Sequence, residues 1–134
     1  MSYTLSTTLD RPYDETVEAV RDALADQGFG VLTEIDLRAT LKAKLDVNVP
    51  PHVILGACRP QLAHRALGID PSIAAVLPCN VTVREVEPGR TRVEAFDPHA
   101  MADLAGDAFS DVATEARQRL GAALDALGGR DDLA

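Results

Sequence analysis

Hydrophobic and polar positions change their spacing several times along the first part of the chain. Over residues 3–9 they alternate, which is the pattern of a strand with one buried face. Apolar residues then recur every three or four positions over 11–27 and predict an amphipathic helix that Asp10 caps and Gly28 ends. Alternation resumes over 29–36 and predicts a second strand.

The remaining segments are shorter and are separated by proline and glycine. Leucines four residues apart predict a short helix over 36–45, and the apolar run at 52–58 is typical of a central strand. Strands at 79–86 and 91–97 flank the sequence Glu-Pro-Gly-Arg, which predicts a hairpin turn. Three more helical segments are expected at 60–68, 98–106 and 107–127.

This order, β-α-β-α-β-α-β-β-α, predicts an α+β fold with a mixed, mostly antiparallel sheet and helices packed on one face. Residues 1–129 are expected to form a single domain, and 130–134 a frayed tail. The polar strand positions would face away from the helices; they are Thr4, Ser6, Thr8, Glu34, Thr82 and Arg84. Such a face is either wet or covered by a second subunit, and a homodimer is the preferred interpretation.

The composition limits the kinds of partner that the protein is expected to bind. The 134 residues include no apolar run near the ~20 residues of a membrane helix. The first residues show no signal peptide, so a cytoplasmic location and no membrane contact are expected. The net charge of −8 disfavours nucleic acid, which binds through neutralised phosphates. Arg38, Lys42 and Lys44 are the only local basic group, and we interpret them as a solvated helix face.

The two cysteines carry the candidate chemistry. A reducing compartment argues against a structural disulfide, and the absence of paired Cys/His clusters argues against a structural zinc site within one chain. Cys58 ends a strand just before Arg59 and a helix start, where backbone N–H groups and the neighbouring cation favour a thiolate. It is a candidate nucleophile, soft metal ligand or redox sensor. The alternative is a small buried residue beside Gly56 and Ala57.

Cys79 shares the predicted core face of its strand with Val81 and Val83, which favours a packing role. If the strands at 52–58 and 79–86 are antiparallel neighbours, the two thiols could approach each other. They would then form a ligand pair or a switchable disulfide. Periodicity leaves this pairing open.

The histidines do not cluster in the sequence. His99 follows Asp97 and Pro98 at a helix start, where the helix dipole disfavours protonation and suits a metal ligand or a general base. Capping alone also explains Asp97. No known catalytic spacing is present.

Six segments resemble domain-of-unknown-function family 302 over nearly the whole chain. They are GFGVLTEID at 28–36, ATLKAKL at 39–45, VILGACRP at 53–60, LAHRALGIDP at 62–71, VLPCNVTV at 76–83 and VEAFDP at 93–98. The resemblance implies a small, dimeric α+β domain with no assigned activity. The positions that match the family pattern are Asp36, Lys44, Cys58, Pro60, Pro78, Cys79, Asn80, Asp97 and Pro98. Arg59 departs from that pattern, which has asparagine there; a guanidinium donates hydrogen bonds but cannot accept them.

Three functions remain open. The preferred one is a binding or sensing module with a thiol-lined site for a small molecule, a cofactor or a metal. Its candidate residues are Cys58, Arg59, Cys79, Asn80, Asp97, His99, Asp36 and Lys44. The second is a dimeric scaffold whose cysteines only pack. The third is an enzyme with Cys58 as nucleophile, for which the sequence nominates no base.

Overall fold

The computed structural model describes residues 2–128, so the predicted tail at 130–134 lies outside the described part. Five strands form one sheet in the order β1-β5-β4-β3-β2. Every neighbouring pair of strands is antiparallel, which agrees with the mostly antiparallel sheet that the sequence predicts. The strands are β1 (Thr4–Leu9), β2 (Gly30–Asp36), β3 (His52–Cys58), β4 (Cys79–Glu87) and β5 (Arg90–Phe96).

Five α-helices and two short 3₁₀ turns complete the described part of the chain, which confirms an α+β fold. The helices are α1 (Tyr13–Asp26), α2 (Leu37–Leu45), α3 (Pro60–Ile69), α4 (Pro98–Ala105) and α5 (Ser110–Leu127). The 3₁₀ turns are η1 (Pro71–Val76) and η2 (Asp107–Phe109). None of these described helices is long and apolar enough to span a bilayer.

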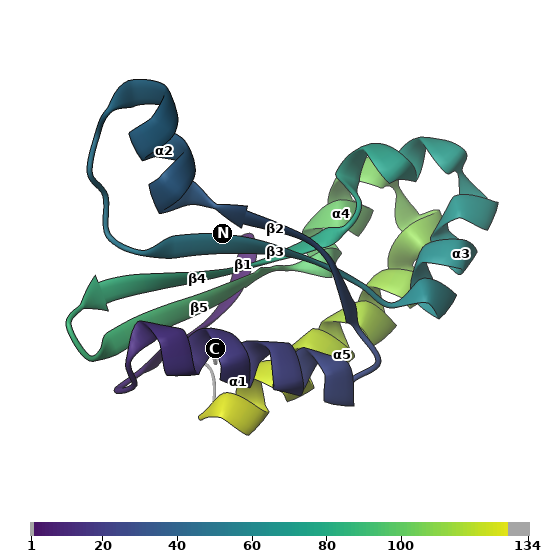
Figure 1. Ribbon diagram of the computed structural model, residues 1–134. Coiled ribbons are helices and arrows are strands. Elements are labelled where there is room, and N and C mark those ends of the chain that lie inside the picture. Colours follow the sequence, from purple (N-terminus) through teal and green to yellow (C-terminus); the bar gives the residue numbers. More distant parts are fainter. Residues whose placement is uncertain (1, 129–134) are drawn as a thin grey trace.

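Two helices cover one face of the sheet. Figure 1 shows α1 and α5 below the sheet, whereas α2 lies above it at one end and α3 and α4 lie at the other end. Val20 and Leu24 of α1 and Leu120 of α5 pack on fully buried strand residues such as Leu55 and Val83. The amphipathic helices therefore close the main hydrophobic core against one sheet face only.

A second hydrophobic cluster lies where α3, α4 and the first turns of α5 meet. Its largest buried members are Leu62, Ile73, Met101, Phe109 and Val112. Because α5 also contributes to the main core, this one helix joins the two clusters.

The start of α1 differs from the prediction. The capping position is Pro12, which has no side-chain acceptor, and Asp10 lies outside the helix. The Thr16 hydroxyl instead donates to the Pro12 carbonyl at 2.8 Å.

Edge strand β2 contains a bulge that reverses the predicted direction of Glu34. Val31 pairs with Ala57 on the helix side, but the register shifts before Thr33, which pairs with Gly56. Glu34 consequently pairs with Leu55 on the helix-covered face, where it forms an ion pair with Arg21 of α1. One inserted residue moves every later side chain to the opposite face.

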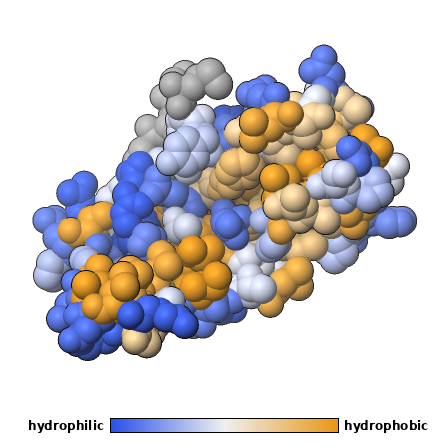
Figure 2. Space-filling model, turned by 90° about the horizontal axis from the view of Figure 1, so that it is seen from above, coloured by the Kyte–Doolittle hydropathy of each residue, from blue (hydrophilic) through white to orange (hydrophobic). Residues whose placement is uncertain are grey.

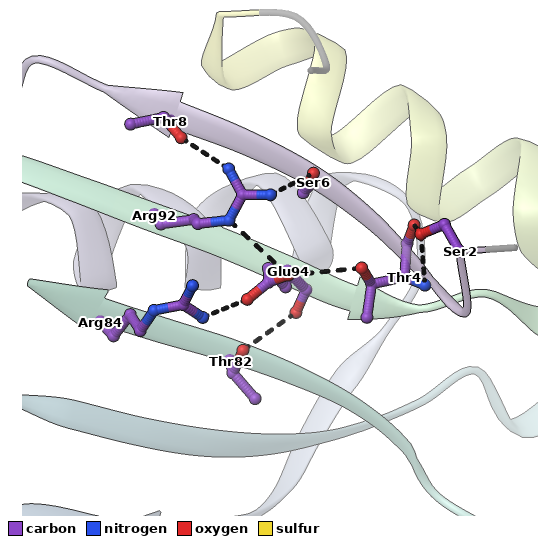
Figure 3. A network of polar contacts seen from close by, with 8 residues as sticks. All are labelled: Ser2, Thr4, Ser6, Thr8, Thr82, Arg84, Arg92 and Glu94. Carbon is purple, nitrogen blue, oxygen red and sulfur yellow. Dashed lines mark hydrogen bonds and ion pairs between the residues drawn. The ribbon is translucent and has the colours of Figure 1, made fainter. Parts of the chain in front are cut away.

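The uncovered sheet face carries a polar network (Figure 3). Its eight residues are Ser2, Thr4, Ser6, Thr8, Thr82, Arg84, Arg92 and Glu94. Glu94 lies at the centre: Arg84 forms an ion pair with its carboxylate, and Arg92 Nε lies 3.6 Å from Glu94 Oε2. Arg92 also donates to the Ser6 and Thr8 hydroxyls at 3.0 and 2.9 Å. The network satisfies side chains that no helix covers.

We expect Glu94→Gln to destabilise the protein by about 1–3 kcal/mol near pH 7, since it removes a charge that both arginines contact. Burial raises the pKa of Glu94, but the hydrogen bond and charge of Arg84 and the charge of Arg92 outweigh it and hold that pKa below its usual value of 4.5. Stability from a depressed carboxyl pKa is complete above the unfolded pKa and is lost as pH falls through the folded one.

Urea denaturation at several pH values measures this difference. The gap between wild type and Glu94→Gln should be full above about pH 5 and shrink as the pH falls below the unfolded value. Glu87→Gln is the control, because Glu87 is 61% exposed and lies 3.7 Å from Arg90. A gap that stays constant down to about pH 3 would contradict this role for Glu94.

Gly56 lies where three elements meet closely. A Cβ built there would overlap Thr33 Oγ1 and lie 2.8 Å from Pro78 Cγ. The threonine hydroxyl can rotate away, but the proline ring cannot. We expect Gly56→Ala to cost about 1–3 kcal/mol of unfolding free energy, measured by urea denaturation. The matched control is Gly68→Ala on α3, where no atom lies within 4 Å of the new Cβ and a small stabilisation is expected. Equal stability of the two variants would refute the close packing at Gly56.

Candidate functional site

A small apolar cavity lies where the end of β3 and the start of β4 meet the second hydrophobic cluster. Its volume is about 30 Å³, close to the share of one water molecule in the liquid. Cys58, Arg59 and Cys79 contribute to its wall together with apolar side chains such as Leu62 and Met101. We call it the thiol cavity.

Strand register brings the two cysteines to this point. Cys79 pairs with Ala57, so it lies beside the residue that precedes Cys58. This is the antiparallel pairing that the sequence leaves open. Both cysteines are free thiols and are partly buried.

The environment of Cys79 keeps its thiol neutral. Burial, and secondly the nearby Cys58, raises the pKa of Cys79 from 9.0 to about 11. Desolvation disfavours the thiolate because a charge in apolar surroundings loses its hydration. Within residues 2–128 no hydrogen bond reaches either sulfur. Cys79 is therefore a protonated, weakly polar wall of the cavity.

Arg59 also lines the thiol cavity, and its side chain contains a buried hydrogen-bond donor. It occupies the capping position of α3, and its Nη1 donates to Gln61 Oε1 at 3.2 Å. Its Nε is buried and has no hydrogen-bond partner in the described part of the chain. Gly28 makes room for the side chain: a Cβ at that position would lie 3.2 Å from Arg59 Nε. A buried donor without an acceptor costs about 1–3 kcal/mol.

Three other candidates lie near the cavity in the fold but not on its wall. Asn80 is exposed and pairs with Gly56. Asp97 caps α4 by accepting from the His99 N–H at 3.0 Å, and Arg117 Nε lies 3.2 Å from its carboxylate. His99 lines separate polar hollows against α5. Capping and an ion pair thus account for Asp97.

The last two candidates lie at the start of α2 and within it. Asp36 caps this helix, because its carboxylate accepts from the Ala39 N–H at 2.9 Å. Lys44 is exposed on the same helix, and neither residue lines the thiol cavity. No group of three or more His, Cys, Asp or Glu within residues 2–128 is arranged to hold a metal ion.

The sequence does not single out the apolar part of the wall. Phe29, Leu62 and Met101 line the cavity, yet each has the pattern of an ordinary core residue. The sequence indicates Gly28 only as the end of a helix, although the absence of a side chain there also leaves room for the Arg59 side chain. Its positive φ of 81° gives no separate sign of that second role.

Fold and site define a small α+β domain with one antiparallel sheet and an apolar cavity lined by two free thiols. The family model described as Domain of unknown function DUF302 matches residues 5–127, and the chain belongs to this family, which confirms the resemblance seen in the sequence.

One solved structure extends this likeness to three dimensions. It is the crystal structure of an uncharacterized conserved DUF302 protein from Bacillus stearothermophilus, with a TM-score of 0.87 and 29% identity. The match covers 95% of this chain and 99% of that one. The comparison with curated proteins gives no match.

The raised pKa of Cys79 predicts how this thiol reacts. In the Cys58→Ser variant, only Cys79 remains, and its alkylation by iodoacetamide should accelerate about tenfold per pH unit up to about pH 10. The reason is that the thiolate is the reactive form and is scarce well below the pKa. Mass spectrometry of timed samples gives the rates, with Cys79→Ser as the companion single-thiol variant. A rate for Cys79 that levels off below about pH 9 would show that its thiol is not suppressed by burial.

Proposed function

We propose that this DUF302 domain is a small-ligand binding or sensing module, with the thiol cavity as its site. The observation that supports this most is that Arg59, whose buried Nε has no acceptor in the described part of the chain, is one of the residues that line the apolar cavity. A ligand with one acceptor group and an apolar body would satisfy the donor and contact the apolar wall. Short carboxylates have this chemistry, because an arginine binds a carboxylate through charge-assisted hydrogen bonds.

The size of the cavity limits how such a ligand enters. About 30 Å³ admits little more than a water molecule, so a larger body requires α3 or α4 to move outward. These helices belong to the smaller cluster rather than to the main core. Widening the cavity there would leave the sheet and its covering helices in place.

A metal is a weaker candidate for this site. Structural zinc needs four ligands, and the cavity wall offers two thiols with no histidine or carboxylate among its lining residues. An enzyme with Cys58 as nucleophile needs a base within hydrogen-bond reach, and the same lining residues supply none.

The second candidate is a homodimeric scaffold with inert cysteines. The burial of Cys79 beside Ala57 supports this alternative, since free cysteine often packs as a small apolar residue. On either proposal we place the protein in the cytoplasm, because free thiols persist in reducing compartments.

A thermal-shift titration with acetate, butyrate, hexanoate and octanoate tests the binding proposal. At a concentration of about ten times Kd, a bound carboxylate should stabilise the wild type by about 1.4 kcal/mol, or a few degrees in Tm. Arg59→Met removes the donor but keeps an unbranched side chain. This variant should lose the response while its unliganded Tm stays equal or rises, because the unsatisfied buried donor is gone.

Two controls make the result specific. Arg65→Met removes an exposed arginine from the same helix, one that pairs with Glu115, and should leave the carboxylate response intact. Cys58→Ser and Cys79→Ser separate the two proposals: an altered carboxylate response supports a binding site, whereas lower stability with no carboxylate effect in any variant supports the scaffold. A response that is the same in Arg59→Met and wild type would contradict the proposed role of Arg59.

A further inference from the structure

Strand β2 forms an open edge of the sheet. It pairs with β3 on one side only, because the strand order ends at β2. None of the seven residues of β2 is buried, whereas four of the six residues of β1, the strand at the other edge, are buried. Leu32 and Ile35 of β2 are 66% and 46% exposed. Solvent therefore reaches β2 along the side that has no partner strand.

The backbone of this edge has hydrogen-bonding groups without a partner. Apart from the pairing with β3, no hydrogen bond among residues 2–128 involves the backbone of residues 30–35. A row of free N–H and C=O groups along a sheet edge is a template for another strand. Residues 33–36 follow the bulge and pair with β3 in regular register, so this part of the edge can accept a straight strand.

The uncovered face of the sheet is a poorer docking surface than this edge. In the view from above, Figure 2 shows hydrophobic residues gathered toward both ends, with hydrophilic residues between them. The polar network around Glu94 lies on that face, and its side chains bind one another (Figure 3). A partner on that face would have to bury groups that are already paired. The edge instead offers backbone groups that an added strand would satisfy.

Negative charge gathers beside β2. After the bulge, Glu34 and Asp36 both lie on the helix-covered face, because their partners in β3 belong to the main core. Glu34 forms an ion pair with Arg21, so this side of α1 lies next to β2. Burial, and then the charges of Asp36, Asp14 and Glu34, raises the pKa of Tyr13 at the start of α1 to about 12. Carboxylates from β2 and α1 thus act on the same place.

Helix α1, which lies below the sheet in Figure 1, continues this negative surface. Its one basic residue is Arg21, and its acidic residues, all exposed, are Asp14, Glu15, Glu18, Asp22 and Asp26. None of these five carboxylates has a hydrogen-bond or ion-pair partner in the described part of the chain. Four of them are spaced by four residues and lie along one side of the helix, where like charges repel each other. A positively charged partner would relieve this repulsion.

We propose that β2 binds an extended basic segment of another protein, which adds to the sheet as a sixth strand beside α1. Main-chain hydrogen bonds to β2 supply affinity, and the side chains of the added strand alternate between two different surroundings. On the helix-covered face they lie near Glu34, Asp36 and the carboxylates of α1, which favours lysine or arginine. On the other face they lie beside Ile35, which favours an apolar residue.

The same charges disfavour the other occupants of an open edge. An antiparallel pairing of two β2 strands would bring Glu34 and Asp36 of both copies together, and like charges on neighbouring strands are destabilising. Nucleic acid is repelled because its phosphates are negative as well. Charged residues that keep an edge from pairing with its own copy still leave it open to a basic strand.

This interaction is independent of the proposed function. Among the residues that line the thiol cavity, none belongs to β2 or α1. Failure of one proposal would therefore leave the other standing.

Fluorescence anisotropy with a labelled synthetic peptide tests the proposal. The probe is a strand of about eight residues in which lysine and valine alternate. It should bind the wild type with a Kd of about 10–100 μM at low salt, and at least about fivefold more weakly at about 0.5 M salt. The same peptide with methylated backbone nitrogens keeps its charges but cannot donate to β2, so it should bind at least about tenfold more weakly.

Charge reversal on the protein identifies the site. Asp14→Lys with Glu18→Lys should weaken binding of the lysine–valine peptide about tenfold and allow a glutamate–valine peptide to bind instead. Asp103→Lys with Asp107→Lys is the matched control, because it makes the same change in net charge at exposed positions of α4 and η2. This control should keep the affinity within about twofold of the wild type. Circular dichroism checks that both variants are folded.

Hydrogen exchange measured by mass spectrometry locates the bound peptide. Binding should slow amide exchange in residues 30–36 and leave β1 unchanged. No binding at about 1 mM peptide, or binding without slower exchange in β2, would overturn the proposal. So would an equal loss of affinity in the two charge-reversed variants. If exchange in β2 slows with rising concentration of the protein alone, a second copy occupies the edge and the proposal is wrong.

Discussion

The pairing of β3 with β4 determines where the chemical groups of this domain lie. Its register places Cys79 opposite Ala57 and Asn80 opposite Gly56. Small residues are required there because Thr33 and Pro78 close over Gly56, and any side chain at that position meets a rigid ring. Strand β3 ends at Cys58, and α3 begins at Pro60 with only Arg59 between them. Both thiols and the Arg59 side chain therefore reach one point at the end of the sheet.

A sheet covered on one face must make the other face acceptable to water or to a partner. In this domain the centre of the uncovered face is polar, with Glu94 between Arg84 and Arg92. Toward its ends, by contrast, α2 and α4 expose apolar side chains, among them Leu45 and Leu104. The charged groups in the middle are paired and are stable in contact with water. Exposed leucine side chains, in contrast, would be stabilised if a partner covered them. The uneven distribution is what distinguishes this face from a simple solvated surface.

Periodicity predicted most of the fold, since strands and helices each depend on spacings that the sequence shows directly. The bulge in β2 could not be seen, because Val31, Thr33 and Ile35 alternate as smoothly as in a regular strand. Only the partner strand reveals that the register shifts and that Glu34 turns toward Arg21.

The candidate site was predictable where the chemistry is distinctive. The sequence indicated Cys58, Arg59 and Cys79 as candidate site residues, and the structure places these three on the wall of one cavity. It also indicated Asp36, the last residue of β2, and Lys44 of α2, because a match to a family pattern does not tell which matched positions are neighbours in space. No sequence pattern distinguishes the apolar residues that line the thiol cavity. Residues that line a small cavity and residues that fill a core satisfy the same hydrophobic pattern, and only packing separates them.

Two spaces lie at the end of the molecule where α3 and α4 pack against the first turns of α5. The main core binds α1 and α5 to the sheet through fully buried side chains such as Leu24 and Leu120. Beyond the sheet, residues of α3, α4 and α5 line the thiol cavity, and residues of η1, α4 and η2 line a separate hollow of about 260 Å³. Met101 lies between the two spaces, so a shift of α4 changes both at once. An opening confined to this smaller cluster would leave the sheet and its main core intact, because local openings cost less free energy where fewer apolar side chains are buried.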